Sequence, residues 1–317
     1  MAASHSTGTL ATIAVSRIRA NPDNPRLTFR QHELEELQES IRQYGIQVPI
    51  AVFKRGAHFI LIDGERRWRC ASKLNIETIP ALIQREPKPL ENLLLMFNIH
   101  ALREQWDLMT IALKLPKISD LIQKETGKLP TEIELSAKTG LGRGVIRRCR
   151  LLTNLPDKYQ KMLLEELTKP KSKQLLSEDL FIEMERSLTT VARAMPGVID
   201  KINDARDVLL TKYKSKIFDN IVDLRKIAKI ARAEKVDADP LKARKAIARL
   251  LTDPKYSINK AWDETVSGAY AERDVLTRIE QLLSKLDELE PSEVDDDVRE
   301  KLEELLTRTQ KLLGVDA

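Results

Sequence analysis

The segment DGERRWRC, residues 63–70, decides how this chain folds. It follows an apolar, β-rich run at 59–62 and opens a helical pattern, so a strand should end and a helix begin here. The first amide groups of a helix lack partners within it, and the helix dipole places partial positive charge at the same end. Arg66, Arg67 and Arg69 add fork-shaped donors that match phosphate oxygens. The segment therefore predicts an anion site suited to phosphate.

The same arginines permit a second interpretation. They could lie on a surface helix and pair with Glu33, Glu35 or Glu36 of the preceding amphipathic segment. The sequence alone leaves both interpretations open. Trp68 lies among these charges, and we expect it to pack in the core rather than to stack on a base.

The flanking residues predict a compact α/β domain followed by helices. Val48–Phe53, Phe59–Ile62 and Ile79–Ile83 are β-rich, and the amphipathic pattern of Glu33–Tyr44 ends at Gly45. From about residue 90 the β signal stops and helical stretches continue. We expect each proline there to mark a helix boundary. These prolines are Pro116, Pro130, Pro156, Pro170, Pro196, Pro240 and Pro254.

The composition is that of a soluble globular protein. Of 317 residues, 42% are hydrophobic and 32% are charged, which excludes both a disordered chain and a membrane protein. No apolar run approaches the roughly 18 residues of a membrane span, and the first residues do not resemble a signal peptide. We therefore expect a cytoplasmic protein. Its cysteines, Cys70 and Cys149, should not form a disulfide.

The charge is unevenly distributed along the chain. Residues 270–317 hold 7 basic and 14 acidic side chains, a net charge of −7, whereas the whole chain carries +5. The remaining residues therefore carry a net charge of +12. A basic body favours a polyanionic partner, although a basic enzyme would have the same charge.

Residues 131–152, TEIELSAKTGLGRGVIRRCRLL, predict a helix-turn-helix. Its second helix would present Arg143, Arg147, Arg148 and Arg150 to the major groove of double-stranded DNA. A basic surface helix in an ordinary bundle is the alternative. We expect Leu135, Ala137, Ile146 and Leu151 to pack between the two helices.

These motifs together resemble the ParB partition-protein family. The resemblance rests on NPDNPR at 21–26, GIQVPI at 45–50, LIDGERRWRC at 61–70, IPA at 79–81 and the helix-turn-helix followed by NLP at 154–156. It implies a ParB/sulfiredoxin-like domain that binds CTP with Mg²⁺, in a protein associated with the nucleoid or a plasmid. The implied nucleotide-binding residues are Gly45, Pro49, Ile50, Gly64, Glu65, Arg66, Arg67, Arg69 and Asn98, and Asn98 would also be the metal ligand.

Two positions depart from the family pattern. Val48 stands where the family commonly has Gln, and Phe97 stands where it usually has Glu beside Asn98. Phe cannot replace a carboxylate as a Mg²⁺ ligand. The resemblance therefore implies nucleotide binding with slow or absent hydrolysis. It leaves a weak CTPase activity open and identifies no catalytic residue.

The acidic end of the chain predicts a helical hairpin. One apolar stripe contains Leu276, Ile279 and Leu283, and a second contains Val298 and Leu305. These stripes could pack within the chain or form a homodimer. The absence of Lys and Arg before residue 17 does not favour the ParA-type ATPase partner that the family commonly engages through a basic N-terminal peptide.

The expected fold class is α+β, with a ParB/sulfiredoxin-like α/β domain at 1–90 and a helix-turn-helix domain at 91–160. A helical extension at 161–269 and the acidic hairpin at 270–317 would follow. The expected function is that of a sequence-specific DNA-binding protein acting as a CTP-dependent switch or clamp, in DNA partition or a related plasmid, phage or defence role. The alternatives are a helix-turn-helix transcriptional regulator or adaptor without nucleotide control, and a ParB-fold nuclease.

Overall fold

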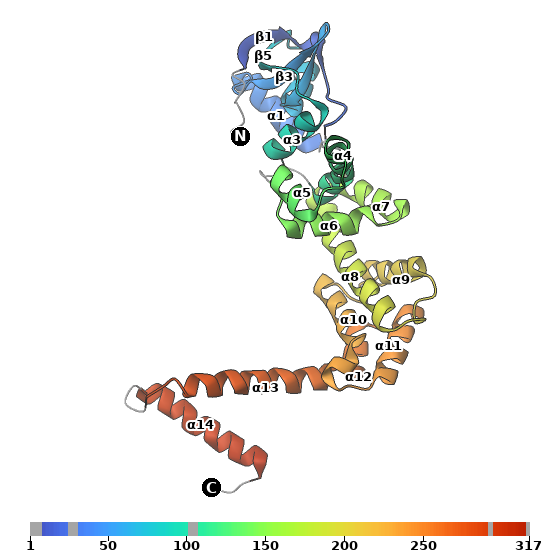
Figure 1. Ribbon diagram of the computed structural model, residues 1–317, viewed down its shortest axis with the longest axis vertical. Helices are drawn as coiled ribbons and strands as arrows, with labels where there is room; N and C mark the ends of the chain where they lie inside the picture. The colour runs from blue at the N-terminus through green and yellow to red at the C-terminus, as the bar shows by residue number, and fades with distance from the viewer. Residues whose placement is uncertain (1–7, 25–30, 101–106, 291–293, 315–317) are drawn as a thin grey trace. The chain divides into compact units, whose positions relative to one another are not determined.

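The computed structural model describes residues 8–24, 31–100, 107–290 and 294–314; the side chains of residues 32 and 98–100 lie outside the description. The chain divides into two compact units, Met1–Arg186 and Ser187–Ala317 (Figure 1). The α/β domain and the helix-turn-helix both belong to the first unit, so both candidate sites are built within it.

The α/β domain is built on a mixed five-stranded sheet with the order β1-β5-β3-β4-β2. β1 pairs antiparallel with β5, and β3 pairs antiparallel with β4, whereas the β3–β5 and β2–β4 pairs are parallel. The strands are β1 (Thr9–Ala14), β2 (Ile18–Arg19), β3 (Ile50–Arg55), β4 (His58–Asp63) and β5 (Thr78–Gln84). β3 and β4 carry the two motifs of the expected nucleotide site to neighbouring positions in the sheet.

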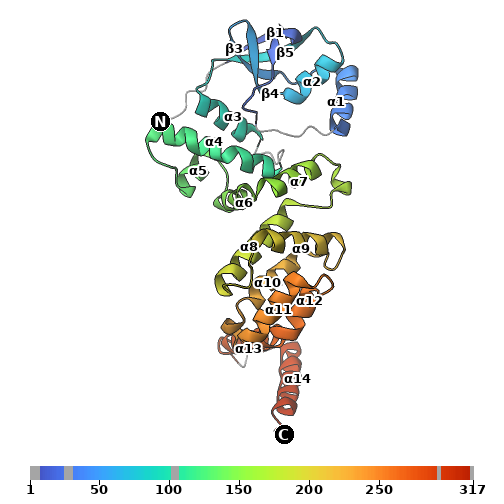
Figure 2. The ribbon, with the colours of Figure 1, turned by 90° about the vertical axis from the view of Figure 1, so that its right-hand side faces the viewer.

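Two helices of the α/β domain, α1 (Gln31–Tyr44) and α2 (Glu65–Lys73), pack against each other (Figure 2). Leu34 and Ile41 of α1 form a buried cluster with Cys70 of α2, and Trp68 packs against the core of the sheet. Burying these side chains removes apolar surface from water and holds the start of α2 beside the sheet. The expected strand-to-helix transition at residue 64 is confirmed.

Helices form the rest of the first unit. They are α3 (Pro89–His100), α4 (Leu108–Thr126), α5 (Glu132–Thr139), α6 (Arg143–Thr153) and α7 (Asp157–Leu167), followed by the 3-10 turn η2 (Lys171–Lys173). The expectation that Pro116 ends a helix is wrong, because Pro116 lies inside α4. Seven residues of α4 are buried. Their packing offsets the roughly 3 kcal/mol that a proline costs in a helix interior.

The second unit is also helical. α8 (Glu178–Ala194) begins in the first unit and ends in the second, where α9 (Ile202–Lys214), α10 (Leu224–Ile230), α11 (Pro240–Thr252) and α12 (Ile258–Thr265) follow, with the 3-10 turns η3 (Ile221–Asp223) and η4 (Ala233–Val236). The buried Nζ of Lys212 donates to the carbonyl oxygens of Asp253 (2.7 Å) and Tyr256 (2.5 Å). Lys212 therefore fixes the connection between α11 and α12.

The acidic end forms two helices, α13 (Ser267–Leu286) and α14 (Asp296–Leu313), neither of which has a buried residue. Leu276 and Leu283 remain 57% and 55% exposed. The apolar stripes are therefore not covered by the described part of this chain. No helix in the described ranges combines the length and apolar character needed to cross a membrane.

Candidate nucleotide and DNA sites

The start of α2 is held in a conformation that requires glycine. Gly64 has a φ of +93°, in the left-handed region, and a Cβ placed there would lie 2.6 Å from Cγ2 of the buried Ile50. The Gly64 N–H donates to Asp63 Oδ1 at 2.7 Å. Trp68 N–H is bonded to Gly64 O at 3.0 Å, which is the usual i to i−4 helix bond. The amides of residues 65–67 precede that bond, as expected at a helix start.

Arg67 brings the two expected nucleotide motifs together. Its Nη1 donates to the backbone oxygens of Val48 (2.6 Å) and Pro49 (2.8 Å), and its Nη2 donates to Asp63 Oδ2 (3.0 Å). The guanidinium thus joins the segment before β3 to the start of α2. A phosphate bound at this helix start would compete with these acceptors for the donors of Arg67.

The other two arginines have protein partners as well. Arg66 Nη2 donates to Glu33 O at 3.1 Å and lies 3.7 Å from Glu33 Oε2, as the alternative interpretation expects for this one residue. Arg69 donates twice to Glu65 Oε1, at 2.8 and 2.5 Å. Glu65 is only 8% exposed and also accepts a hydrogen bond from Asn24. Each of the three arginines at this helix start is therefore paired with a carboxylate of the chain.

The remaining positions of interest at the expected nucleotide site are Gly45, Phe97 and Asn98. Gly45, with a φ of +71°, ends α1, and its N–H donates to Ile41 O at 2.8 Å. The side chain of Asn98 lies outside the described residues. Phe97 is fully buried in α3 and therefore serves as a core residue. Among the described residues no group of three His, Cys, Asp or Glu side chains could hold a metal ion.

The segment NPDNPR, which the sequence offered only as part of the resemblance to the ParB family, also contributes contacts beside this site. Asn21 is 5% exposed, and its Nδ2 donates to Leu61 O (2.9 Å) and Asn92 Oδ1 (3.1 Å). It thereby ties β4 to α3. The only signal in the sequence was the pair of asparagines beside prolines, whose distant partners no local pattern identifies.

The helix-turn-helix is formed by α5, a turn through Gly140 and α6. A capping box at Thr131 and Glu134 starts α5, and Gly140 ends it with a φ of +73°. Gly142 makes no side-chain cap for α6, as expected from the sequence. Burial of Leu135, Thr139, Leu141, Ile146, Cys149 and Leu152 holds the two helices together.

Two expected packing positions of the helix-turn-helix are wrong. Ala137 is exposed, and Leu151 is only half-buried while Leu152 is fully buried. α6 packs against α4 as well as α5, so its buried stripe includes Cys149 and Leu152. Burial raises the pKa of the Cys149 thiol to about 12, consistent with a buried structural thiol.

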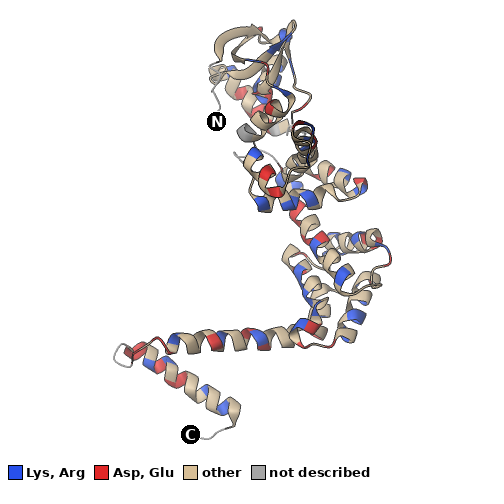
Figure 3. Ribbon diagram, in the orientation of Figure 1, with Lys and Arg blue, Asp and Glu red and all other residues tan. Residues whose placement is uncertain are grey.

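The four arginines of α6 differ in their partners. Arg143 and Arg147 both bind Glu132, and Arg148 binds Asp179 at the start of α8. Arg150 is exposed and has no ion pair among the described residues. Figure 3 shows basic residues along α6 with acidic ones nearby on α5 and α8. The side chains of Arg143 and Arg147 remain 55% and 59% exposed, which leaves them accessible to DNA.

Comparisons with known proteins identify the first part of the chain. Residues 1–96 match the family model of the ParB N-terminal domain. The resemblance to the ParB family is confirmed. The chromosome-partitioning protein ParB of Caulobacter vibrioides is 30% identical over 155 residues, which cover 48% of this chain and 49% of that protein. The match thus spans about half the length of that relative.

Two solved ParB structures are also similar to this chain. The C-terminally truncated ParB of Caulobacter crescentus complexed to the centromeric parS site is 20% identical with a TM-score of 0.43 and covers 70% of this chain and 98% of that one. The same protein complexed with CTP-γ-S is 24% identical with a TM-score of 0.29 and covers 56% and 93%.

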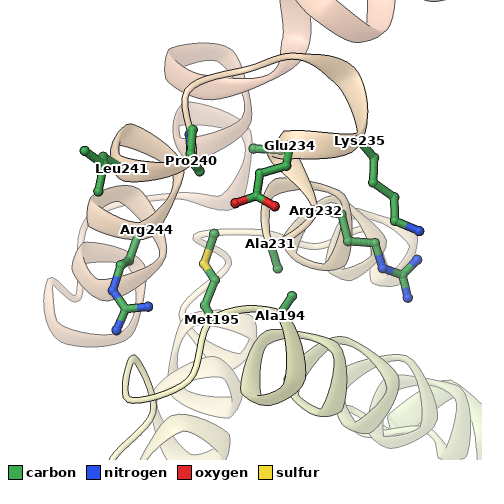
Figure 4. Close-up of a pocket in the computed structure, with 10 residues that line it drawn as sticks. Ala194, Met195, Ala231, Arg232, Glu234, Lys235, Pro240, Leu241 and Arg244 are labelled. Atoms are coloured by element: carbon green, nitrogen blue, oxygen red, sulfur yellow. The ribbon is translucent and has the colours of Figure 1, made fainter.

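A separate cavity of about 370 Å³ lies in the second unit, outside the ParB N-terminal domain. It is lined by the end of α8, η4 and the start of α11. Glu234 points toward the space between Pro240 and Met195, whereas Lys235 extends away from it (Figure 4). Arg244 donates to Pro196 O at 2.7 Å, so this side chain supports the wall of the cavity.

Proposed function

We propose that this protein is a ParB-like, sequence-specific DNA-binding protein whose DNA-bound state is controlled by CTP. The observation that carries the proposal is the exposed arginine face of α6, on the second helix of a helix-turn-helix that lies in the same unit as a ParB N-terminal domain. Side chains on such a helix read base edges in the major groove, and nearby arginines bind phosphate.

The start of α2 is the proposed site of the CTP phosphates. Its amides and Arg66, Arg67 and Arg69 fit phosphate in charge and geometry. Gly45, Pro49 and Ile50 would lie near the base, and Glu65 and Asn98 would complete the site. CTP would replace the backbone oxygens of Val48 and Pro49 as acceptors for Arg67, so it would favour a conformer in which this segment has moved. A ligand shifts a conformational equilibrium only through such a difference in binding.

The fit is poorer for Mg²⁺. Among the described residues no cluster of carboxylates is poised for a metal, and Phe97 is buried where the family usually has Glu. Mg²⁺ would therefore rest mainly on the triphosphate and its own waters, with Asn98 as the proposed protein ligand. We accordingly propose that CTP is bound but hydrolysed slowly or not at all. Release of the nucleotide would then set the lifetime of the DNA-bound state.

The proposed assembly is a homodimer joined through α13 and α14. Their uncovered apolar stripes fit a second copy, and a two-fold dimer matches a palindromic DNA site. We propose the domain boundaries 90, 160 and 269 for this arrangement. We propose a role in DNA partition, which the resemblance to the ParB family suggests. We do not propose a ParA-type partner.

DNA binding is tested by fluorescence anisotropy, after selection of a preferred duplex from a random pool. Arg143→Ala and Arg147→Ala should each weaken binding by about tenfold or more, in a sequence-dependent manner where the side chain reads a base. Arg42→Ala, on the exposed side of α1, is the control. If both α6 variants bind every duplex as the parent does, the DNA site is wrongly assigned.

A regulator without nucleotide control is the second candidate. It is favoured by the hydrogen bonds of Arg66, Arg67 and Arg69 to protein acceptors, which use donors that the first candidate assigns to phosphate. Calorimetric titration with CTP, ATP, GTP and UTP separates the two. Preferential CTP binding supports the switch, and the absence of binding by any nucleotide supports the second candidate.

A further inference from the structure

Glu132 accepts hydrogen bonds from two of the arginines that we propose to contact DNA. Arg143 Nε donates to Glu132 Oε1 at 2.8 Å. Arg147 binds the same carboxylate in a fork, with Nε 3.1 Å from Oε2 and Nη2 2.9 Å from Oε1. One carboxylate thus accepts a hydrogen bond from each of two guanidinium groups and forms a further close charge contact with Arg147 Nη2. The three side chains together carry a net charge of +1 instead of the +2 of the arginines alone.

The position of Glu132 at the start of α5 favours a charged carboxylate beside the two arginines. It is the first residue of α5, where the helix dipole favours a negative charge. Its side chain is 17% exposed and is covered by arginines that are themselves more than half exposed. The hydrogen bonds from Arg147 and then Arg143 lower the pKa of Glu132, so it stays ionised. Glu134, two residues later, is occupied by the capping box.

The cluster leaves donors for a second acceptor. Among the described residues, Arg143 donates only through Nε, so both of its Nη groups remain available for a base edge or phosphate. Within the same part of the chain Arg147 contacts Glu132 through Nε and Nη2, and its Nη1 remains available. Directed hydrogen bonds to DNA can therefore form while Glu132 stays in place, but the attraction of the cluster for any phosphate is reduced.

We propose that Glu132 is a specificity-determining residue that suppresses binding to non-specific DNA. The inference rests on the proposed DNA-binding function and concerns the same helix. Non-specific binding depends on neutralising phosphates, so it falls when the local charge is lowered. Specific binding also depends on hydrogen bonds to base edges, and these gain from arginines that are already held in one conformation. Glu132 therefore widens the ratio between specific and non-specific affinity.

The test replaces Glu132 by glutamine, which has nearly the same shape but no charge. Affinity for a random-sequence duplex should rise about tenfold near physiological salt, and affinity for the preferred duplex should rise by much less or fall. The slope of log K against log salt for the random duplex should become steeper by about one, equivalent to one additional phosphate contact. Both affinities are measured by anisotropy at several salt concentrations.

Glu125→Gln is the matched control. Glu125 is exposed on α4 and makes no ion pair within the described part of the chain, so its replacement changes the net charge equally. It should leave both affinities within about twofold of the parent. Circular dichroism should show that Glu132→Gln remains folded. Glu132→Asp is a second variant, in which the charge remains but the shorter side chain changes the contacts with Arg143 and Arg147.

The outcomes separate this inference from the proposed function. A random-duplex affinity in Glu132→Gln equal to that of the parent overturns the inference, as does an equal rise for both duplexes. If the parent has no preferred duplex, or if Arg143→Ala and Arg147→Ala bind like the parent, the proposed DNA site fails instead. A loss of affinity for both duplexes would overturn the inference and assign Glu132 a purely supporting role.

Discussion

Replacing Glu178 by glutamine should stabilise the first unit near neutral pH. Glu178 begins α8, and its Oε1 accepts a hydrogen bond from the N–H of Met109 at 2.6 Å, near the start of α4. Burial raises its pKa to about 6, and the charges of Asp107 and Asp179 contribute to the rise. At neutral pH the folded protein therefore keeps a carboxylate charged in surroundings that disfavour the charge.

The sign and magnitude follow from the two pKa values of Glu178. Because its pKa is about 6 in the folded protein and 4.5 ordinarily, the folded state binds the proton more tightly than the unfolded state does. Its contribution therefore increases stability as pH falls through about 6 and levels off below about 4.5. The full difference corresponds to about 2 kcal/mol. Glutamine stays neutral and can accept the same hydrogen bond, so Glu178→Gln should gain up to about 2 kcal/mol at pH near 7.

The assay is urea unfolding of parent and variant at about pH 7 and about pH 5, with hydrogen exchange at the Met109 amide as a local readout. The gain should shrink to less than about half at the lower pH, because the parent becomes protonated there. Glu125→Gln is the control, since Glu125 is exposed on α4 and makes no ion pair within the described part of the chain. An equal gain at both pH values, or a less stable variant at pH 7, would refute the argument from burial.

Three further predictions concern the sites described above. Gly64→Ala should lower the free energy of unfolding by roughly 2–5 kcal/mol in urea denaturation, because it combines left-handed backbone strain with overlap on Ile50. In Gly56→Ala the new Cβ meets no atom within 4 Å, so only the backbone strain should lower the free energy of unfolding. Arg67→Ala should weaken CTP binding by about ten- to a hundredfold in calorimetry, corresponding to one charge-assisted contact, and unchanged affinity would exclude this helix start as the site. Deletion of residues 270–317 should reduce the mass in light scattering from dimer to monomer, and a parent that is monomeric at micromolar concentration would contradict the proposed dimer.

Local sequence patterns predicted the elements of the fold but not their long-range contacts. The β-rich run at Ile79–Ile83 and the helix start at Gly64 were confirmed because strand propensity and glycine chemistry act over a few residues. Pro116 was misjudged because buried neighbours of α4 outweigh a local helix breaker. On α6, Leu152 is buried more fully than Leu151 because α6 packs against α4 as well as α5, and no local pattern predicts that contact.

The candidate site likewise combines residues that the sequence predicted with contacts that it did not predict. The arginines near residue 66 were evident from the sequence, whereas their partners were only partly so. Arg67 reaches backbone oxygens 18 and 19 residues away, and backbone acceptors leave no signature in side-chain identity. Glu132 lies 11 and 15 residues before the arginines that it binds, and nothing in the local helical pattern joins them.

The lack of buried residues in α13 and α14 would make protein concentration a variable in their folding. A helix that buries no side chain is stabilised mainly by its own backbone hydrogen bonds and surface pairs, whereas most helical stability in proteins comes from the packing of an apolar face. Association with a second copy would add the missing apolar contacts, so mass action would raise the helical fraction. In dilute solution these residues should therefore exchange their amide hydrogens and be cleaved by proteases faster than in concentrated solution, while the rest of the chain is unaffected.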